Sequence, residues 1–282
     1  MKKIRFLKYH ALGNDFIVLD LIGRRTAALD FEKLAPAICH RRTGIGGDGI
    51  LVLMSSRRAD LRLELYNADG SWAEKSGNGL RIAAACYHRY HKKNRRIEIE
   101  TEVATESARI ISGRSGNYRI RVSLGQPEFQ TNKIPMRSKQ KYHINAPVKI
   151  DGVEIVLTAL SVGNPHAVIY VDSFDFDWPF LGEVIEHSRI FPRRTNVEFA
   201  KIKSRSEIVL NDWERGAGAT GSSGTGAAAA VAAGVVNGYV NRRVRVQFPL
   251  GELVIDWSDD DNRLYLTGPV EEIADGEYRI AD

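Results

Sequence analysis

The chain carries four landmarks twice, in the same order, and this internal duplication constrains its fold more than any other feature. Gly13-Asn14 recurs as Gly163-Asn164, an offset of 164 − 14 = 150 residues, and each pair precedes an apolar run. Three further recurrences have offsets between 147 and 152 residues: Arg41-Arg42-Thr43 with Arg193-Arg194-Thr195, Tyr66-Asn67 with Trp213-Glu214, and Ser76-Gly77-Asn78-Gly79 with Ser223-Gly224-Thr225-Gly226. This period is far too long for a solenoid repeat. The sequence therefore predicts two similar domains, and we expect a ligand to bind in a cleft that they share.

Hydrophobic periodicity predicts the elements of each domain. Helices are expected over 80–90 and 227–237, each directly after a Ser-Gly-x-Gly turn, and Asn237-Gly238 is a typical helix stop. Short β-rich or alternating runs predict strands at 16–19, 50–53, 61–66, 118–122 and 168–171. The predicted class is α+β, with two pseudo-symmetric β-rich domains, each wrapped around a central helix. We expect one domain over 1–124 plus about 271–282, with a last strand near Tyr278 returning to the first, and the other over 125–270.

Composition limits the function classes. Hydrophobic residues make up 43% of the 282 residues and the net charge is +5, the balance of a globular protein. The sequence shows no transmembrane run and no signal peptide, so a cytoplasmic protein without membrane partners is expected. Basic clusters at 88–96 and 137–143 lack any nucleic-acid motif, so they predict solvated surface rather than nucleic-acid binding. Cys39 and Cys86 are expected to be buried and reduced.

The two Ser-Gly-x-Gly turns carry the chemistry. A helix N-terminus has unsatisfied N–H groups and a partial positive charge, and glycine lets a ligand approach that backbone. Two such helix starts facing one cleft would bind a carboxylate and stabilise a carbanion beside it. Ser76 and Ser223, at the tips of the turns, would then stand on opposite faces of the ligand.

Polar side chains in or beside the duplicated landmarks predict the rest of the site. Four asparagines with Glu214 and Arg215 would bind an ammonium group and a carboxylate at the far end of a substrate. The asparagines are Asn14, Asn67, Asn164 and Asn196. A hydrolase serine would need a base, for which only His166 is an obvious candidate. No zinc spacing, phosphate loop or dinucleotide fingerprint is present, so no metal and no cofactor are expected.

Several long, ordered motifs resemble those of the diaminopimelate epimerase family from about residue 8 to the end of the chain. They are residues 10–16 (HALGNDF), 44–49 (GIGGDG), 67–71 (NADGS), 77–81 (GNGLR), 163–166 (GNPH), 194–196 (RTN) and 214–218 (ERGAG). The resemblance implies a cofactor-independent isomerase that interconverts LL- and meso-diaminopimelate, an amino acid of lysine and peptidoglycan-precursor biosynthesis. It also implies a small-molecule amino-acid substrate, and it leaves the assembly open between a monomer and a homodimer.

The resemblance assigns roles to individual residues. In that family one cysteine thiolate removes the α-proton and an opposite cysteine thiol returns one, and these two positions here are Ser76 and Ser223. The family's substrate contacts correspond to Asn14, Asn67, Asn164, Asn196, Glu214 and Arg215. The backbone N–H groups after each serine would hold the α-carboxylate; these residues are Gly77, Asn78, Gly224 and Thr225. Smaller departures are Lys75, where an uncharged residue is expected, and Ala219, where the family usually has Glu.

The exchange of both thiols for hydroxyls leaves three interpretations open. A cysteine beside a helix N-terminus is partly ionised at neutral pH, whereas a serine hydroxyl needs an adjacent base. The chain is an epimerase whose bases have been exchanged, or a divergent relative that catalyses a different isomerisation or elimination on an amino or carboxylic acid, or an amino-acid-binding protein without turnover. Lys75 and Ala219 favour natural divergence over a double point mutation.

Overall fold

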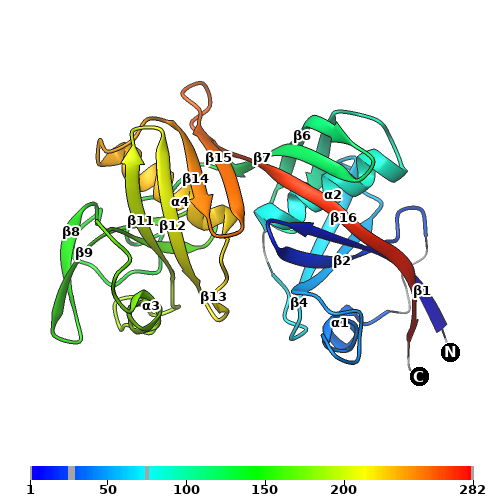
Figure 1. Cartoon of the computed structure of the whole chain (residues 1–282), viewed down its shortest axis with the longest axis horizontal. Helices are drawn as coiled ribbons and strands as arrows, with labels where there is room; N and C mark the ends of the chain where they lie inside the picture. The colour runs from blue at the N-terminus through cyan, green and yellow to red at the C-terminus, as the bar shows by residue number, and fades with distance from the viewer. Residues whose placement is uncertain (1, 25–28, 74–75, 281–282) are drawn as a thin grey trace. The chain divides into compact units, whose positions relative to one another are not determined.

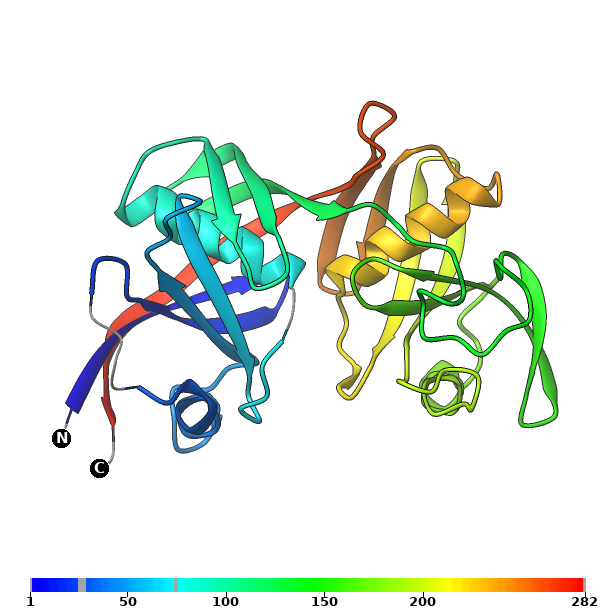
Figure 2. The same cartoon turned by 180° about the vertical axis from the view of Figure 1, so that it is seen from behind.

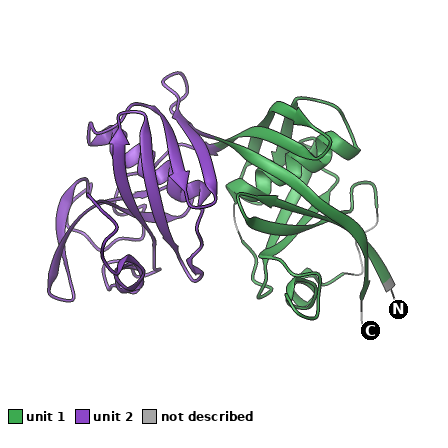
Figure 3. Cartoon of the chain, viewed as in Figure 1, with its two compact units in different colours: residues 1–123, 267–282 green, residues 124–266 purple. Residues whose placement is uncertain are grey.

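The structure is a computed structural model that describes residues 2–24, 29–73 and 76–280 (Figure 1). The chain divides into two compact units (Figure 3). Unit 1 comprises residues 1–123 and 267–282, and unit 2 comprises residues 124–266. Among the described residues, no helix combines the length and apolarity needed to cross a membrane.

Unit 1 is a sheet that closes around a helix. Its helices are α1 (Phe31–Cys39) and α2 (Gly77–Tyr90). Its strands are β1 (Lys2–Ala11), β2 (Asn14–Asp20), β3 (Gly49–Met54), β4 (Leu61–Asn67), β5 (Arg96–Glu100), β6 (Thr105–Arg114), β7 (Asn117–Gly125) and most of β16 (Leu264–Ile280). They adjoin one another in sequence order from β1 to β7, and β16 closes the sheet because it lies next to β7 and also pairs with β1. Tyr278 lies opposite Ile4, so the predicted return of the last strand to the first is confirmed.

Unit 2 repeats this plan. Its helices are α3 (Trp178–Glu186) and α4 (Gly224–Val236). Its strands are β8 (Ala146–Ile150), β9 (Val153–Ser161), β10 (Pro165–Tyr170), β11 (Asn196–Ser204), β12 (Glu207–Glu214), β13 (Gly218–Ala219), β14 (Arg243–Phe248) and β15 (Gly251–Trp257). The parallel pairs β2–β3 and β4–β5 of unit 1 have counterparts in the parallel pairs β10–β11 and β12–β14. The duplication seen in the sequence is therefore a duplication of strand topology.

A buried helix occupies the centre of each unit, as predicted (Figure 2). Most residues of α2 and of the alanine-rich α4 are buried. Alanine allows close approach of strands on every side, and α4 contacts β9, β10, β11 and β15. Helix α4 ends at Asn237, and Gly238 follows in the left-handed conformation with a φ of +73°, which glycine adopts without strain. The fold class predicted from the sequence is confirmed.

Helices α1 and α3 were not expected from the sequence. Both have nine residues, and each is capped by an aspartate whose carboxylate accepts a hydrogen bond from the backbone, Asp30 from Lys33 N and Asp177 from Phe180 N. Pro36 lies inside α1, where a proline normally argues against a helix. Packing of its apolar face, including Leu34 and Ile38, against unit 1 stabilises α1 despite this residue.

The two cysteines are buried and free, as expected. Burial raises the pKa of Cys39 to about 11 and that of Cys86 well above its ordinary value. Neither thiol lies in the first turn of a helix, since Cys39 ends α1 and Cys86 lies in the third turn of α2.

Candidate active site

Ser76 and Ser223 each cap the central helix of their unit. Both have extended backbones, and each hydroxyl accepts a hydrogen bond from the N–H three residues later. The distances are 3.0 Å from Gly79 N to Ser76 Oγ and 3.2 Å from Gly226 N to Ser223 Oγ. An oxygen that accepts this bond retains its own hydrogen for donation. The two hydroxyls thus sit at two anion-binding helix starts of the same construction.

In unit 1 a chain of polar side chains joins the helix start to the turn before β2. Asn78 Nδ2 donates to Asn14 Oδ1 at 2.9 Å, and Asn14 Nδ2 donates to Asp48 Oδ2 at 2.8 Å. Arg41 Nη2 donates to Asp48 Oδ1 at 2.6 Å and to Asp15 Oδ1 at 2.8 Å. The structure therefore brings Asn14 and Asn78 together beside Ser76, and the duplicated arginine motif anchors them.

Asn67 is the last residue of β4 and leads into the turn that follows it. Its Nδ2 donates to Ser71 Oγ at 2.9 Å, and the backbone of the same turn meets Asp48, because Ala68 N donates to Asp48 O at 3.1 Å. Asn67 is thus placed near the Asp48 end of the polar chain. Lys75, noted as a departure from the family pattern, lies outside the described residues.

Arg81 is a fully buried cation one turn below Ser76. Its Nη2 donates to Asn78 Oδ1 at 2.7 Å and its Nη1 donates to Gly77 O at 3.2 Å. Among the described residues its Nε has no hydrogen-bond partner, and burial lowers the guanidinium pKa to about 9. A buried positive charge behind a helix N-terminus increases the attraction of that terminus for an anion. Arg81 belongs to the motif at 77–81, but no pattern in the sequence distinguishes it from a surface arginine.

In unit 2 a second chain of polar side chains runs along β10 toward α4. Asn164 Nδ2 donates to Thr225 Oγ1 at 3.4 Å, and Asn164 Oδ1 lies 2.9 Å from His166 Nε2. His166 Nδ1 lies 2.6 Å from Glu198 Oε1, and both side chains are completely buried. His166 is therefore linked to a carboxylate that the sequence analysis did not identify.

Asn196 holds the turn that carries Glu214 and Arg215. It is buried, its Nδ2 donates to Pro165 O at 2.8 Å, and its Oδ1 accepts from Arg215 N at 2.9 Å. Glu214 Oε1 accepts from Thr220 Oγ1 at 2.6 Å. These bonds place Asn196, Glu214 and Arg215 at one end of the β10–β11–β12 sheet. Ala219, the other departure, is an exposed residue of β13 opposite Trp213.

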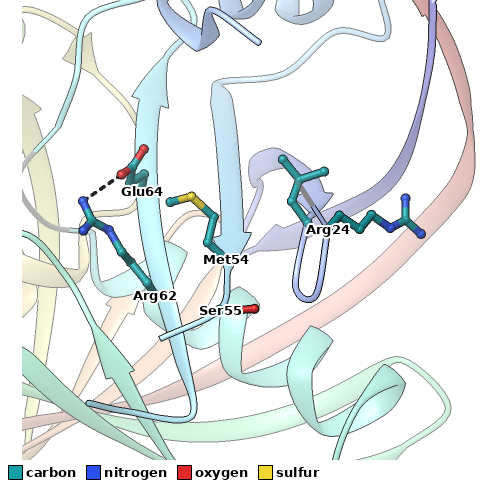
Figure 4. A pocket seen from close by; sticks show the side chains of 6 residues that line it. Arg24, Met54, Ser55, Arg62 and Glu64 are labelled. Carbon is teal, nitrogen blue, oxygen red and sulfur yellow. Dashed lines mark hydrogen bonds and ion pairs between the residues drawn. The ribbon is translucent and has the colours of Figure 1, made fainter. Parts of the chain in front are cut away.

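A separate open pocket lies elsewhere in unit 1 (Figure 4). It is lined by Leu21, Arg24, Met54, Ser55, Arg62 and Glu64. Arg62 Nη2 donates to Glu64 Oε1 at 2.9 Å, so two of the three charged side chains in the pocket form an ion pair and Arg24 is the third. None of the predicted site residues is among the six.

Solved structures with the same fold define a class of protein. The chain aligns over 99% of its length with a probable proline racemase from Agrobacterium radiobacter, with 93% of that chain covered, a TM-score of 0.72 and 15% identity. It also aligns over 99% of its length with a phenazine biosynthesis protein of the PhzF family from Bacillus anthracis, covering that whole chain with a TM-score of 0.69 and 15% identity. The fold is that of the racemase- and epimerase-type isomerases.

Within this class, the family is shown by sequence. The model of the diaminopimelate epimerase family matches residues 6–129 and 158–273. The chain is 40% identical to the diaminopimelate epimerase of Pelotomaculum thermopropionicum over 98% of its own length and 99% of that protein. It is also 40% identical to that of Heliobacterium modesticaldum, over 98% of its own length and the whole of that protein. The chain belongs to the diaminopimelate epimerase family.

Proposed function

We propose that the chain is a cofactor-independent epimerase that interconverts LL- and meso-diaminopimelate. The observation that carries this proposal is the match to diaminopimelate epimerases along nearly the whole length of both partners. The isomerase class agrees with the racemase-type fold. The two capped helix starts supply what such chemistry requires, because their N–H groups favour a carboxylate and the negative charge that develops at the neighbouring carbon.

Individual residues take the following roles in this proposal. Ser76 and Ser223 occupy the positions of the two proton-transfer residues. The N–H groups of Gly77, Asn78, Gly224 and Thr225 hold the α-carboxylate. The remaining substrate contacts are Asn14, Asn67, Asn164, Asn196, Glu214 and Arg215, and His166 supports the site from β10. The bonds among these side chains within each unit hold them in fixed rotamers, which lowers the entropic cost of binding.

We propose that units 1 and 2 are the two domains of the enzyme. The ranges expected from the sequence, 1–124 with about 271–282 and 125–270, lie within a few residues of the two compact units. Each domain contributes one serine that caps its central helix and one set of asparagines. We propose that both domains are needed for turnover, because each contains only one of the two serines.

The replacement of two thiols by hydroxyls lowers the rate of epimerisation that we expect. A thiol with a pKa near 8.5 ionises readily beside a helix N-terminus, whereas a serine hydroxyl transfers a proton only with the help of a base. General-base assistance is typically worth about 10²–10⁴-fold in rate. We therefore expect turnover that is slow for an isomerase and strongly dependent on the charge state of groups around the serines.

Exchange of the α-proton with solvent tests the proposal directly. LL- and meso-diaminopimelate are incubated with the protein in D₂O, and deuterium at the α-carbons is followed by mass spectrometry or NMR. A variant with both Ser76→Ala and Ser223→Ala, prepared in parallel, corrects for any epimerase of the expression host. Exchange above this control is the expected result. Saturable binding without exchange contradicts the proposal and supports the non-catalytic alternative, and exchange on a different acid supports the divergent isomerase.

A further inference from the structure

The strand residues beneath the first turn of the central helix differ in chemistry between the two units. When the two halves are aligned by their serines, the offset is 223 − 76 = 147 residues, and the same offset relates Leu51 to Glu198 (198 − 51) and Leu65 to Asp212 (212 − 65). The structure supports this correspondence. Leu51 and Leu65 are opposite each other on β3 and β4, and Glu198 and Asp212 are opposite each other on β11 and β12. Two leucines in unit 1 are thus replaced by two acids in unit 2.

Leu51 and Leu65 in unit 1, and Glu198 in unit 2, pack against the first turn of the central helix. A methyl group added at Gly79 would lie 3.0 Å from Leu51 Cδ2 and 3.2 Å from Leu65 Cδ1. A methyl group added at Gly226, the corresponding residue of unit 2, would lie 3.0 Å from Glu198 Oε1 and 3.1 Å from Ser223 Oγ. The Glu198 carboxylate and the Ser223 hydroxyl therefore border the same small space beneath the first turn of α4.

Glu198 and Asp212 form a buried acidic pair. Their exposed fractions are 0% and 1%, and among the described residues no lysine or arginine is hydrogen-bonded or ion-paired to either of them; the partners are His166 for Glu198 and Thr220 for Asp212. Within the same described set, Glu198 Oε2 and Asp212 Oδ1 have no hydrogen-bond partner. Burial raises the pKa of Asp212 to about 6, against a hydrogen bond from Thr220, and the nearby charge of Glu198 raises it further. Two buried carboxyls on directly opposite residues of neighbouring strands are stabilised when they hold one proton between them.

Other titratable groups face the pair from the neighbouring elements. His166 on β10 contacts Glu198, and Thr220 Oγ1 lies within hydrogen-bond distance of both Asp212 Oδ2 and Glu214 Oε1, to either of which its single hydrogen can be donated. The Glu198 charge also reaches Tyr170, whose hydroxyl donates to Ala230 O on α4 and whose pKa is raised, mainly by burial. These side chains connect the pair to Asn164 and Thr225 at the helix start and to Glu214 at the end of β12.

We propose that Glu198 and Asp212 share one proton and that Glu198 is the proton acceptor that makes Ser223 competent. This inference rests on the proposed function. The substrate C–H bond breaks as its proton passes to Ser223 Oγ, and the Ser223 O–H bond breaks as that proton passes to the Glu198 carboxylate. The electron pair stays on the substrate carbon, and the carboxylate becomes a carboxylic acid. Return of a proton reverses both transfers. Glu198 and Asp212 are positioning residues, because they act through Ser223.

The same comparison makes the two serines unequal. Ser76 stands above two leucines and near the buried Arg81 cation, so unit 1 favours an anion and offers its hydroxyl no acceptor among these neighbours. Ser223 borders the same space as Glu198, and Asp212 lies opposite Glu198 on the neighbouring strand. The proposal therefore assigns base-assisted proton transfer to unit 2 and predicts that proton exchange with retention of configuration is faster than epimerisation.

Conservative variants test the pair through the exchange assay. Glu198→Gln should lower the exchange rate at least about 100-fold, the usual effect of losing a general base. Glu198→Asp should restore part of the rate, and Asp212→Asn should move the acid limb of the pH profile to lower pH because the like charge is gone. Glu100→Gln is the matched control: Glu100 is a buried carboxylate of unit 1 bonded to Ser56 and Arg58, and its loss should change the rate by less than about twofold. Folded Glu198→Gln and Asp212→Asn proteins that exchange like the unaltered chain would overturn the proposal.

A second readout separates this proposal from the proposed function. Infrared spectra of the ligand-free protein near neutral pH should show the C=O band of a protonated carboxyl that is lost in Asp212→Asn and kept in Glu100→Gln. If the band is present but no diaminopimelate exchange occurs, the acidic pair stands and the proposed substrate is wrong. If the band is absent, the shared proton is wrong whatever the activity.

Discussion

The pKa values of two carboxyls, Asp212 and Asp15, are shifted in opposite directions, so their contributions to stability depend on pH in opposite ways. Burial raises the pKa of Asp212 from 3.8 to about 6. For Asp15, burial alone would raise the pKa, but the side-chain hydrogen bonds and charges of Arg41 and Lys8 lower it below its ordinary value. A carboxyl with a raised pKa holds its proton longer in the folded state than in the unfolded chain. Its contribution to stability therefore falls as pH rises through the window between the two values.

The substitution Asp212→Asn removes the loss of stability that ionisation of Asp212 causes as pH rises. Between about pH 4 and 6 the folded wild-type chain binds more protons than the unfolded chain, so near pH 7 the variant should be more stable by on the order of 1–3 kcal/mol. Near pH 3.5 the two proteins should be alike. Urea denaturation at both pH values measures this. Asp15→Asn is the counterpart and should destabilise near pH 7, with the difference fading in acid. A variant Asp212→Asn that is less stable near pH 7 would contradict the assignment.

At the scale of elements, each serine hydroxyl caps its central helix in addition to its proposed role in proton transfer. Ser76 and Ser223 cap α2 and α4 by accepting the N–H of Gly79 and Gly226. Removing such a cap costs about 1 kcal/mol, so Ser76→Ala and Ser223→Ala should each lower the free energy of unfolding by that amount. Ser112→Ala, at an exposed position of β6, is the control and should have almost no effect. Caps that can be lost without cost would mean that the helix starts are held by other contacts.

The unequal surroundings of α2 and α4 can be measured with thiols. Ser76→Cys places a thiol beside leucines and near Arg81, so its pKa should fall below the ordinary 8.5, whereas Ser223→Cys places one beside Glu198, where its pKa should be higher. The rate of alkylation as a function of pH reports both values, because burial keeps the native thiols of Cys39 and Cys86 protonated. Adding Glu198→Gln should lower the pKa in Ser223→Cys only. Equal values in the two single variants would remove the basis for the asymmetry.

For the whole molecule, the duplicated motifs were sufficient to predict two similar domains, each with a central helix. The glycines and serines of the turns set the backbone geometry at the helix starts, so both central helices and strand β4 before α2 were predicted within a few residues, whereas strand β12 before α4 was not predicted. Helices α1 and α3 were missed because they are short and depend on packing. Pro36 adds a local signal against α1.

Glu198 and Asp212 were missed for a different reason. The first half of β11 is buried on both faces, with α3 on one side and α4 on the other, so the alternation that separates inward from outward residues is absent there. A glutamate in such a run looks like a surface residue of a strand. Aligning the two halves by their serines gives the signal that was available, because it sets both acids against buried leucines.

Restoring both thiols tests how far the whole molecule has departed from its family. If only the bases have been exchanged, Ser76→Cys with Ser223→Cys should greatly raise epimerisation of diaminopimelate, since thiolate chemistry is worth several tenfold steps of about 1.4 kcal/mol each. Each single change should do much less, because removal and return of the proton are one task and the two residues act as a unit. Serine and cysteine differ little in shape, so the fold should tolerate the changes, and the assay needs reductant to prevent a disulfide. Because a carboxylate beside a thiol opposes ionisation of the thiol, adding Glu198→Gln should raise the activity of this double variant further. A folded, reduced double variant that exchanges no α-proton would mean that the pocket has diverged along with its bases.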